Sequence, residues 1–209
     1  MILQALTEYY QALEREGKIA APGWQKSDVS FALCLNDKGE LEQIISVKTP
    51  MEQGKKVVLR PRPMILPVPA AGRTATAVRP NFLWDKSDYL LGISKKGVQR
   101  GIKYFLGSKQ YHASLLSEVS SPAAVALLSF FEKWDPEHAL ENPIFADCLD
   151  ELLKGANMVF RYQGKYVHED PQIQAVWKKH DAAQGEAVQM RCLVTREYAP
   201  IARIHPKIK

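Results

Sequence analysis

The sequence is poor in cysteine, and its cysteines form neither a metal-binding pattern nor a disulfide pattern. Cys34, Cys148 and Cys192 are far apart, no two of them make a Cys-x-x-Cys pair, and none has a histidine at ligand spacing. Each stands among apolar residues, and free cysteine is one of the residue types most often buried in proteins. We therefore expect three buried thiols that act as small apolar side chains.

A long apolar run is also missing. The longest apolar window, 123–131, is far shorter than the roughly 20 residues that a bilayer requires. The N-terminus has no basic leader and polar residues interrupt its apolar positions, so residues 2–16 are interpreted as part of the fold and not as a signal peptide. The 209 residues suffice for one large or two small domains, and we expect a cytoplasmic globular protein.

Familiar catalytic motifs are absent as well. The chain has no Gly-x-Ser-x-Gly, Walker, His-Glu-x-x-His or Gly-x-Gly-x-x-Gly sequence. Among its five scattered histidines, His112 and His138 are interpreted as surface or capping residues. Asp147, Asp150 and Glu151 are interpreted as a solvated helix face and not as a divalent-ion site. We expect a protein that is not an enzyme and uses no metal or cofactor.

The chain does have a concentration of positive charge between Lys48 and Lys103. This stretch holds 12 Lys and Arg against 3 acidic residues, a net charge of +9, whereas the whole chain nets +5. Lys and Arg that neutralise phosphates release condensed counterions, so such a surface is typical of proteins that bind a polyanion. Solvated cations beside proline-rich loops also occur in proteins that bind no nucleic acid, and charge alone does not separate the two interpretations.

Apolar periodicity predicts a helix and short strands in the first half of the chain. Residues 2–16 have helical spacing, 29–35 and 41–47 alternate as the two strands of a hairpin, and 55–60 is predicted as a third strand. Prolines at positions 61, 63, 67, 69 and 80 favour loop or extended edge over a regular ladder for most of the segment after residue 60. The opening of the chain is thus predicted as a helix and a hairpin followed by an irregular basic segment.

The second half is predicted to be mainly helical. The expected elements are a strand at 89–93, a helix from Val98, a helix begun by Ser121-Pro122, a helix at 144–154, a hairpin turning at Gln163-Gly164, a helix from Asp170-Pro171 through Trp177, and a strand from Val188 to Val194. Together the elements predict an α+β fold, with a small antiparallel sheet and hairpins followed by a predominantly helical second half.

One loop inside the basic stretch has the composition of a nucleic-acid contact. The segment AAGRTAT at 70–76 is small and polar and carries one arginine, which suits close approach to a groove and equally describes a flexible surface loop. Arg73 and Arg79 can fork to phosphate or guanine, and Thr74 and Asn81 can contact base edges. The loop is therefore a candidate contact with nucleic acid.

Three separated blocks of the sequence resemble a known family. MILQALTEYYQALEREGKIAAPGW, RTATAVRPNFLWDKSDYLLGI and VQMRCLVTREYAPIARIHPKIK are similar to the N-terminal part of the large subunit of subtype I-C CRISPR interference complexes, the Csd family of Cascade components. The most specific piece is Asn81-Phe82-Leu83 followed by Asp85 and Tyr89-Leu90-Leu91-Gly92. At AGRTATAVRP the chain departs from the family, since Thr76 and Ala77 stand where Ser-Gly is more usual.

The resemblance implies a non-catalytic role in antiviral defence. Such a subunit contacts double-stranded DNA beside the target, recognises the protospacer-adjacent motif and aids strand separation, while the guide RNA reads the rest. Its implied partners are the target duplex, the guide RNA, the other Cascade subunits and a helicase-nuclease recruited by the full complex. The implied domain organisation is an N-terminal domain, 1–209, of a longer subunit, with a basic DNA-facing stretch 48–103, a mainly helical part 104–185 and a truncated strand segment 186–209.

Residue chemistry and resemblance together name the candidate site. The predicted motif-reading residues are Gly72, Arg73, Thr74, Arg79 and Asn81, and the predicted phosphate-binding residues are Lys55, Lys56, Arg60, Arg62, Lys86, Lys95, Lys96 and Arg100. The alternative is a scaffold that binds guide RNA or neighbouring backbone subunits without reading DNA. Processing of the guide precursor is a third, weaker alternative, because the family assigns it to another subunit.

Overall fold

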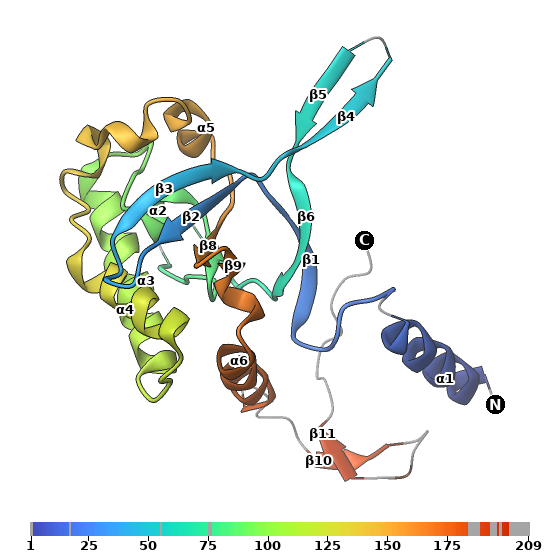
Figure 1. The fold of residues 1–209 in the computed structure, drawn as a ribbon. Coiled ribbons are helices and arrows are strands. Elements are labelled where there is room, and N and C mark those ends of the chain that lie inside the picture. The colour runs from blue at the N-terminus through green and yellow to red at the C-terminus, as the bar shows by residue number, and fades with distance from the viewer. Residues whose placement is uncertain are drawn as a thin grey trace.

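The computed structural model describes residues 2–16, 18–54, 56–74, 77–183, 189–192, 196 and 198–200 (Figure 1). The α-helices are α1 (Ile2–Arg15), α2 (Ser87–Leu90), α3 (Val98–Leu116), α4 (Pro122–Lys133), α5 (Leu149–Leu153) and α6 (Pro171–Ala183). The strands are β1 (Trp24–Val29), β2 (Phe31–Leu35), β3 (Leu41–Ser46), β4 (Thr49–Gln53), β5 (Lys56–Arg60), β6 (Arg62–Pro67), β7 (Trp84–Asp85), β8 (Met158–Tyr162), β9 (Lys165–Tyr166), β10 (Gln189–Arg191) and β11 (Tyr198–Pro200). Three short 3-10 helices are η1 (Ala139–Glu141), η2 (Pro143–Phe145) and η3 (Val167–Glu169). The α+β prediction is confirmed.

A mixed sheet forms the centre of the molecule. Its strand order is β3-β2-β8-β7, with β9 paired to β8; β2 and β8 run parallel and the other pairs run antiparallel. The predicted β2–β3 and β8–β9 hairpins are therefore confirmed. Gln163 and Gly164 both have positive φ, 46° and 79°, as a two-residue hairpin turn requires.

Both faces of this sheet are buried. On β8, Met158 and Phe160 belong to the main core, which helices α3 and α4 cover, whereas Val159 belongs to a smaller core on the other face. Ser121 starts α4 as predicted, because its Oγ accepts a hydrogen bond from Ala124 N–H (3.3 Å) and Pro122 follows at the first helical position. The smaller core is closed by β1 and β6.

The proline-rich segment forms more regular structure than the sequence predicts. β6 pairs with β1 over six residues, with Pro63 opposite Asp28 and Pro67 opposite Trp24. The prolines are compatible with this ladder because β6 pairs with β1 alone and remains an edge strand. Before it, β4 and β5 form a separate two-stranded arm that projects from the rest of the fold (Figure 1).

Two local predictions are wrong. The expected strand at 89–93 is instead the end of α2 and the turn after it, because Lys86 C=O accepts hydrogen bonds from both Tyr89 and Leu90 N–H (3.1 Å each). The expected helix at 144–154 is divided into η2 and α5, since Asn142 Oδ1 accepts from Ile144 N–H (3.1 Å) and closes a short turn there. In both segments, local hydrogen bonds set a secondary structure that differs from the prediction.

The terminal elements follow the predictions where they are described. α1 forms as expected, with Ile2 80% exposed and Tyr9 63% exposed on its apolar face. α6 begins after Asp170, whose Oδ1 accepts from Gln172 and Ile173 N–H, and runs beyond Trp177. β10 pairs with β11; Val188 and Val194 of the predicted last strand lie outside the described residues. Over the part of the chain that the structure describes, no helix has the length and apolar character needed to cross a membrane.

Candidate nucleic-acid interface

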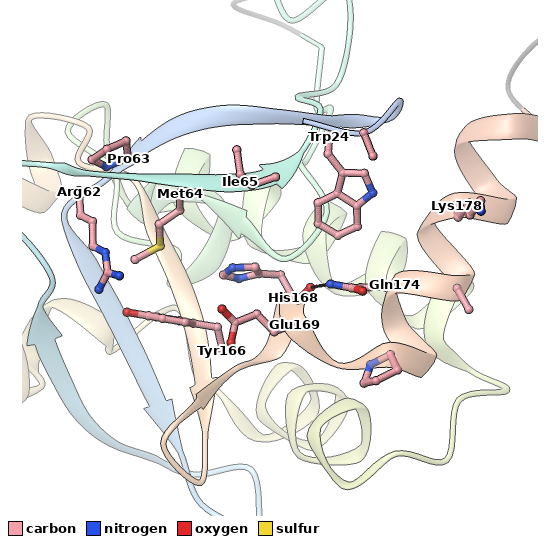
Figure 2. A pocket seen from close by; sticks show the side chains of 13 residues that line it. Trp24, Arg62, Pro63, Met64, Ile65, Tyr166, His168, Glu169, Gln174 and Lys178 are labelled. Atoms are coloured by element: carbon pink, nitrogen blue, oxygen red, sulfur yellow. Dashed lines mark hydrogen bonds between the residues drawn. The ribbon is translucent and has the colours of Figure 1, made fainter. Parts of the chain in front are cut away.

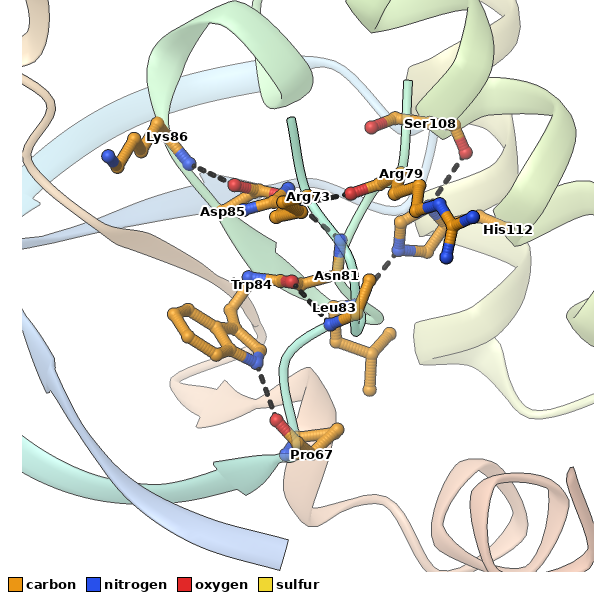
Figure 3. A network of polar contacts seen from close by, with 11 residues as sticks. Pro67, Arg73, Arg79, Asn81, Leu83, Trp84, Asp85, Lys86, Ser108 and His112 are labelled. Carbon is orange, nitrogen blue, oxygen red and sulfur yellow. Dashed lines mark hydrogen bonds and ion pairs between the residues drawn. The ribbon is translucent and has the colours of Figure 1, made fainter. Parts of the chain in front are cut away.

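A buried carboxylate, Asp85, organises the middle of the basic stretch. Its side chain is 1% exposed and forms an ion pair with the Arg73 guanidinium. Asp85 Oδ2 also accepts a hydrogen bond from Asn81 N–H, and Oδ1 accepts from Lys86 N–H, both at 2.9 Å (Figure 3). Burial raises the pKa of Asp85, and Arg73 with the two N–H donors opposes this effect. The carboxylate therefore connects the loop before it to the central sheet.

Further hydrogen bonds close the 68–81 loop at its base. Trp84 Nε1–H donates to Pro67 C=O (2.9 Å), Ala70 N–H donates to Asn81 Oδ1 (3.0 Å), and Arg73 Nε–H donates to Arg79 C=O (2.6 Å). Figure 3 shows the bond from Trp84 to Pro67 and the bond from Arg73 to Arg79. The two ends of the loop are thus fixed by bonds between residues that lie far apart along it.

Two predicted base-reading residues lie in this base. Asn81 is 2% exposed, with its side-chain oxygen bonded to the loop's own backbone. The Arg73 side chain is 27% exposed, with its guanidinium on Asp85 and 4.3 Å from the centre of the Tyr89 ring. Both residues hold the loop in this structure, and base reading by either one stays a prediction.

The other three predicted readers lie at the exposed tip. Gly72 has φ +65°, a backbone conformation that favours glycine, and a Cβ at this position would lie 3.1 Å from Arg79 Nη1. Arg79 is exposed and donates from Nη1 to Ala71 C=O (2.9 Å). Thr74 is exposed and its Oγ1 accepts from Ala77 N–H (3.1 Å). This part of the loop therefore presents the Thr74 hydroxyl and the Arg79 guanidinium, which lies over the backbone of Gly72.

A buried histidine supports the turn beneath the loop. Leu83 has φ +67°, and its N–H donates to His112 Nε2 (2.9 Å), while His112 Nδ1 bonds Ser108 C=O (2.8 Å). These partners require a neutral ring protonated at Nδ1. Burial lowers the pKa of His112 to about 4. The interpretation of His112 as a surface residue is wrong, because its helix places it against Phe82 and Phe131; His138 is exposed and bonds Asp135 (2.7 Å).

We expect acid to destabilise the fold through His112. Its folded-state pKa lies below its unfolded value of 6.5, so the stability it contributes is present above pH 6.5 and is lost as the pH falls towards 4. The free energy of unfolding should fall by about 2 kcal/mol between about pH 7.5 and pH 5 on account of this residue. Urea unfolding of His112→Gln should show a pH dependence weaker by that amount, and an unchanged pH dependence would contradict the assignment.

Four predicted phosphate-binding residues converge beside the loop. Lys86, Lys95, Lys96 and Arg100 line one cavity of about 220 Å³, together with Lys154. We call these five residues the cationic cluster. Asp88 is the acid among the residues that line this cavity, and burial raises the pKa of Asp88. Lys154 was not predicted from the sequence, because it lies more than fifty positions after Arg100. The turn at Gly155 brings this part of the chain next to Lys86.

Alternating cations and aromatic rings join the loop to the cationic cluster. Arg73 lies over Tyr89, whose ring centre is 4.7 Å from that of Tyr104, and Arg100 lies 4.5 Å from the centre of the Tyr104 ring. The rings order the two arginines by cation–π contact. Tyr89 and Tyr104 are themselves buried, so these contacts link the base of the loop at Arg73 to the cationic cluster through the interior.

The remaining predicted cations lie on the arm and at its base. Lys56 and Arg60 are exposed on β5, where Arg60 Nη2 donates to Gln53 Oε1 (3.2 Å), and Arg62 is exposed at the start of β6. Lys55 lies outside the described residues. These cations belong to a different part of the fold from the cationic cluster.

The acidic and cysteine candidates have local roles. Glu151 pairs with Lys48 (2.6 Å), and the described residues contain no group of three or more His, Cys, Asp or Glu that could hold a metal ion. Cys148 is buried as expected, whereas Cys34 and Cys192 are only half-buried; within the described residues none of the three forms a disulfide.

Comparison with known proteins shows a family match for the chain. A family model described as CRISPR-associated protein (Cas_Csd1) matches residues 6–209, nearly the whole chain. No curated protein matches the chain.

Proposed function

We propose that this chain, which belongs to the Cas_Csd1 family of CRISPR-associated proteins and is a Cascade-type subunit, binds double-stranded DNA beside the target of a type I-C surveillance complex. In this role it recognises the protospacer-adjacent motif and aids strand separation. It contributes binding energy and positioning and is not an enzyme. The guide RNA reads the remaining sequence by base pairing.

The observation that carries the proposal is the chain of contacts that links the cationic cluster to the base of the loop. Five cations line one cavity beside a single acid, and the cation–aromatic contacts connect them to the loop. Each Lys or Arg that neutralises a phosphate releases a counterion, so the cluster supplies affinity for any duplex. Base contacts in a groove are needed for motif preference. The cationic cluster supplies the first requirement, and the exposed Arg79 and Thr74 of the neighbouring loop supply the second.

The roles of the predicted residues differ accordingly. The cationic cluster binds phosphates, and Arg79 with Thr74 approaches the base edges from the exposed tip. Arg73 and Asn81 position the tip through Asp85 and the Ala70 backbone. The arm adds Lys56 and Arg60, and a two-stranded β-ribbon fits the width of a major groove.

The proposal implies defined partners and a division of labour. The chain assembles with the other Cascade subunits and the guide RNA in the cytoplasm, and the full complex recruits a helicase-nuclease that cleaves the DNA. A scaffold that binds guide RNA or a neighbouring subunit is the second candidate. It is favoured by the apolar face of α1, where Ile2, Leu6 and Tyr9 are exposed.

Gel shifts of the assembled complex test the proposal. Arg79→Gln should abolish preference among duplexes that differ only beside the target, at about 1–3 kcal/mol for a base contact. Lys95→Ala with Lys96→Ala should weaken all these duplexes alike and flatten the dependence on salt. Indifference of the unaltered complex to the flank would contradict motif recognition and favour the scaffold.

A further inference from the structure

A second cavity, of about 700 Å³, lies away from the cationic cluster. β6 and the start of β1 form one wall of it, and η3 with α6 forms the other. The residues important here are Trp24, Arg62, Met64, Tyr166, His168 and Lys178. Figure 2 shows their side chains around the cavity. Its volume is in the range of small-molecule and nucleotide sites.

The middle of the cavity is aromatic and apolar. Tyr166 and His168 stack with ring centres 5.3 Å apart and an angle of 24° between planes, and Trp24 and Met64 line the wall beside them. His168 is 5% exposed, and within the described part of the chain its Nδ1 has no hydrogen-bond partner. This lining provides flat apolar contact and one buried polar atom that awaits a partner.

Charged groups occupy the two ends of the cavity. Figure 2 shows Arg62 beside Tyr166 at one end and Lys178 beyond Trp24 at the other. Glu169 lies between the ends and is an acceptor for the amino group of a base. Cations at both ends of an aromatic lining match a short single-stranded segment, whose backbone phosphates extend on both sides of a stacked base.

We propose that this cavity takes an unpaired base of a single-stranded nucleic acid, with the base against Trp24, Tyr166 and His168 and backbone phosphates of the same segment at Arg62 and Lys178. The inference rests on the proposed function, because separation of the target duplex supplies unpaired nucleotides. It adds a single-strand site that is distinct from the duplex-binding cluster. Base–aromatic stacking accepts any base, so the site requires no sequence motif.

Binding of labelled oligonucleotides, DNA and RNA of one sequence and about 12 nucleotides long, tests the site on the full chain. Tyr166→Leu keeps apolar bulk but removes the ring, and it should weaken single-strand binding at least about fivefold. Lys178→Gln should also weaken it. Lys179→Gln removes the same charge from the next position of α6, which does not line the cavity, and should leave binding unchanged.

The outcomes separate this site from the duplex-binding surface. Loss of single-strand affinity in Tyr166→Leu and Lys178→Gln, with duplex affinity retained, supports the cavity even if flank preference is absent. Equal effects of Lys178→Gln and Lys179→Gln would overturn it, and this comparison holds if Tyr166→Leu fails to fold. Preference for the DNA or the RNA oligonucleotide identifies the displaced strand or the guide as the occupant.

Discussion

Arg73→Ala is expected to lower the free energy of unfolding by about 3 kcal/mol. Removal of the guanidinium leaves the Asp85 carboxylate buried without its cation, and only the N–H groups of Asn81 and Lys86 remain as partners. Burial already raises the pKa of Asp85, so part of the cost will be relieved by protonation. Urea unfolding near neutral pH measures the effect.

Arg79→Ala is the matched control for Arg73→Ala. Arg79 belongs to the same loop but is exposed, and its side chain bonds one backbone carbonyl. Its removal should cost less than about 1 kcal/mol. Equal losses in the two variants would contradict the positioning role of Arg73. If Arg73→Ala destabilises the fold, weaker DNA binding by this variant does not by itself indicate a lost base contact.

Lys95→Glu combined with Lys96→Glu is expected to weaken duplex binding by at least about tenfold, whatever the flanking sequence. The slope of log affinity against log salt should become shallower by about 2, since two phosphate contacts are lost. Affinity measured across a salt series in the assembled complex tests both expectations.

Lys38→Glu combined with Lys165→Glu changes the net charge by the same amount. These two exposed lysines come after the last residues of β2 and β8. Lys86 lies at the other end of the central sheet, because its neighbour Asp85 pairs with Met158, the first residue of β8. Their replacement should leave the salt slope unchanged. Matching losses in the two double variants would show that net charge, and not the cationic cluster, determines affinity.

Features that depend on local sequence were predictable. The β8–β9 turn was predictable from Gln163-Gly164 because glycine accepts positive φ, and the start of α4 was predictable from Ser121-Pro122 because a cap and a fixed φ are local properties. The strand predicted at 89–93 was wrong because the neighbouring residues Tyr89 and Leu90 are both buried. Their apolar side chains therefore show no periodicity that distinguishes a strand from a helix.

The candidate site was predictable only in part. Charge identified Lys95, Lys96 and Arg100 as candidates, and the structure places them around one cavity, but the presence of Lys154 there depends on a contact distant in sequence. Asp85 was counted as one acid among many cations, although its place directly after an apolar run was a signal of burial. Composition shows which charges a segment carries, whereas only the packing shows which of them are paired.

Photocrosslinking from position 74 tests the central claim most directly. Thr74 is exposed at the loop tip, so a photoreactive residue placed there should crosslink to the duplex immediately beside the target in the assembled complex. The same residue at Lys38, at the other end of the sheet, should give no DNA crosslink. Crosslinks from position 74 to the guide RNA or to a neighbouring subunit, with none to the duplex, would contradict DNA recognition by this loop.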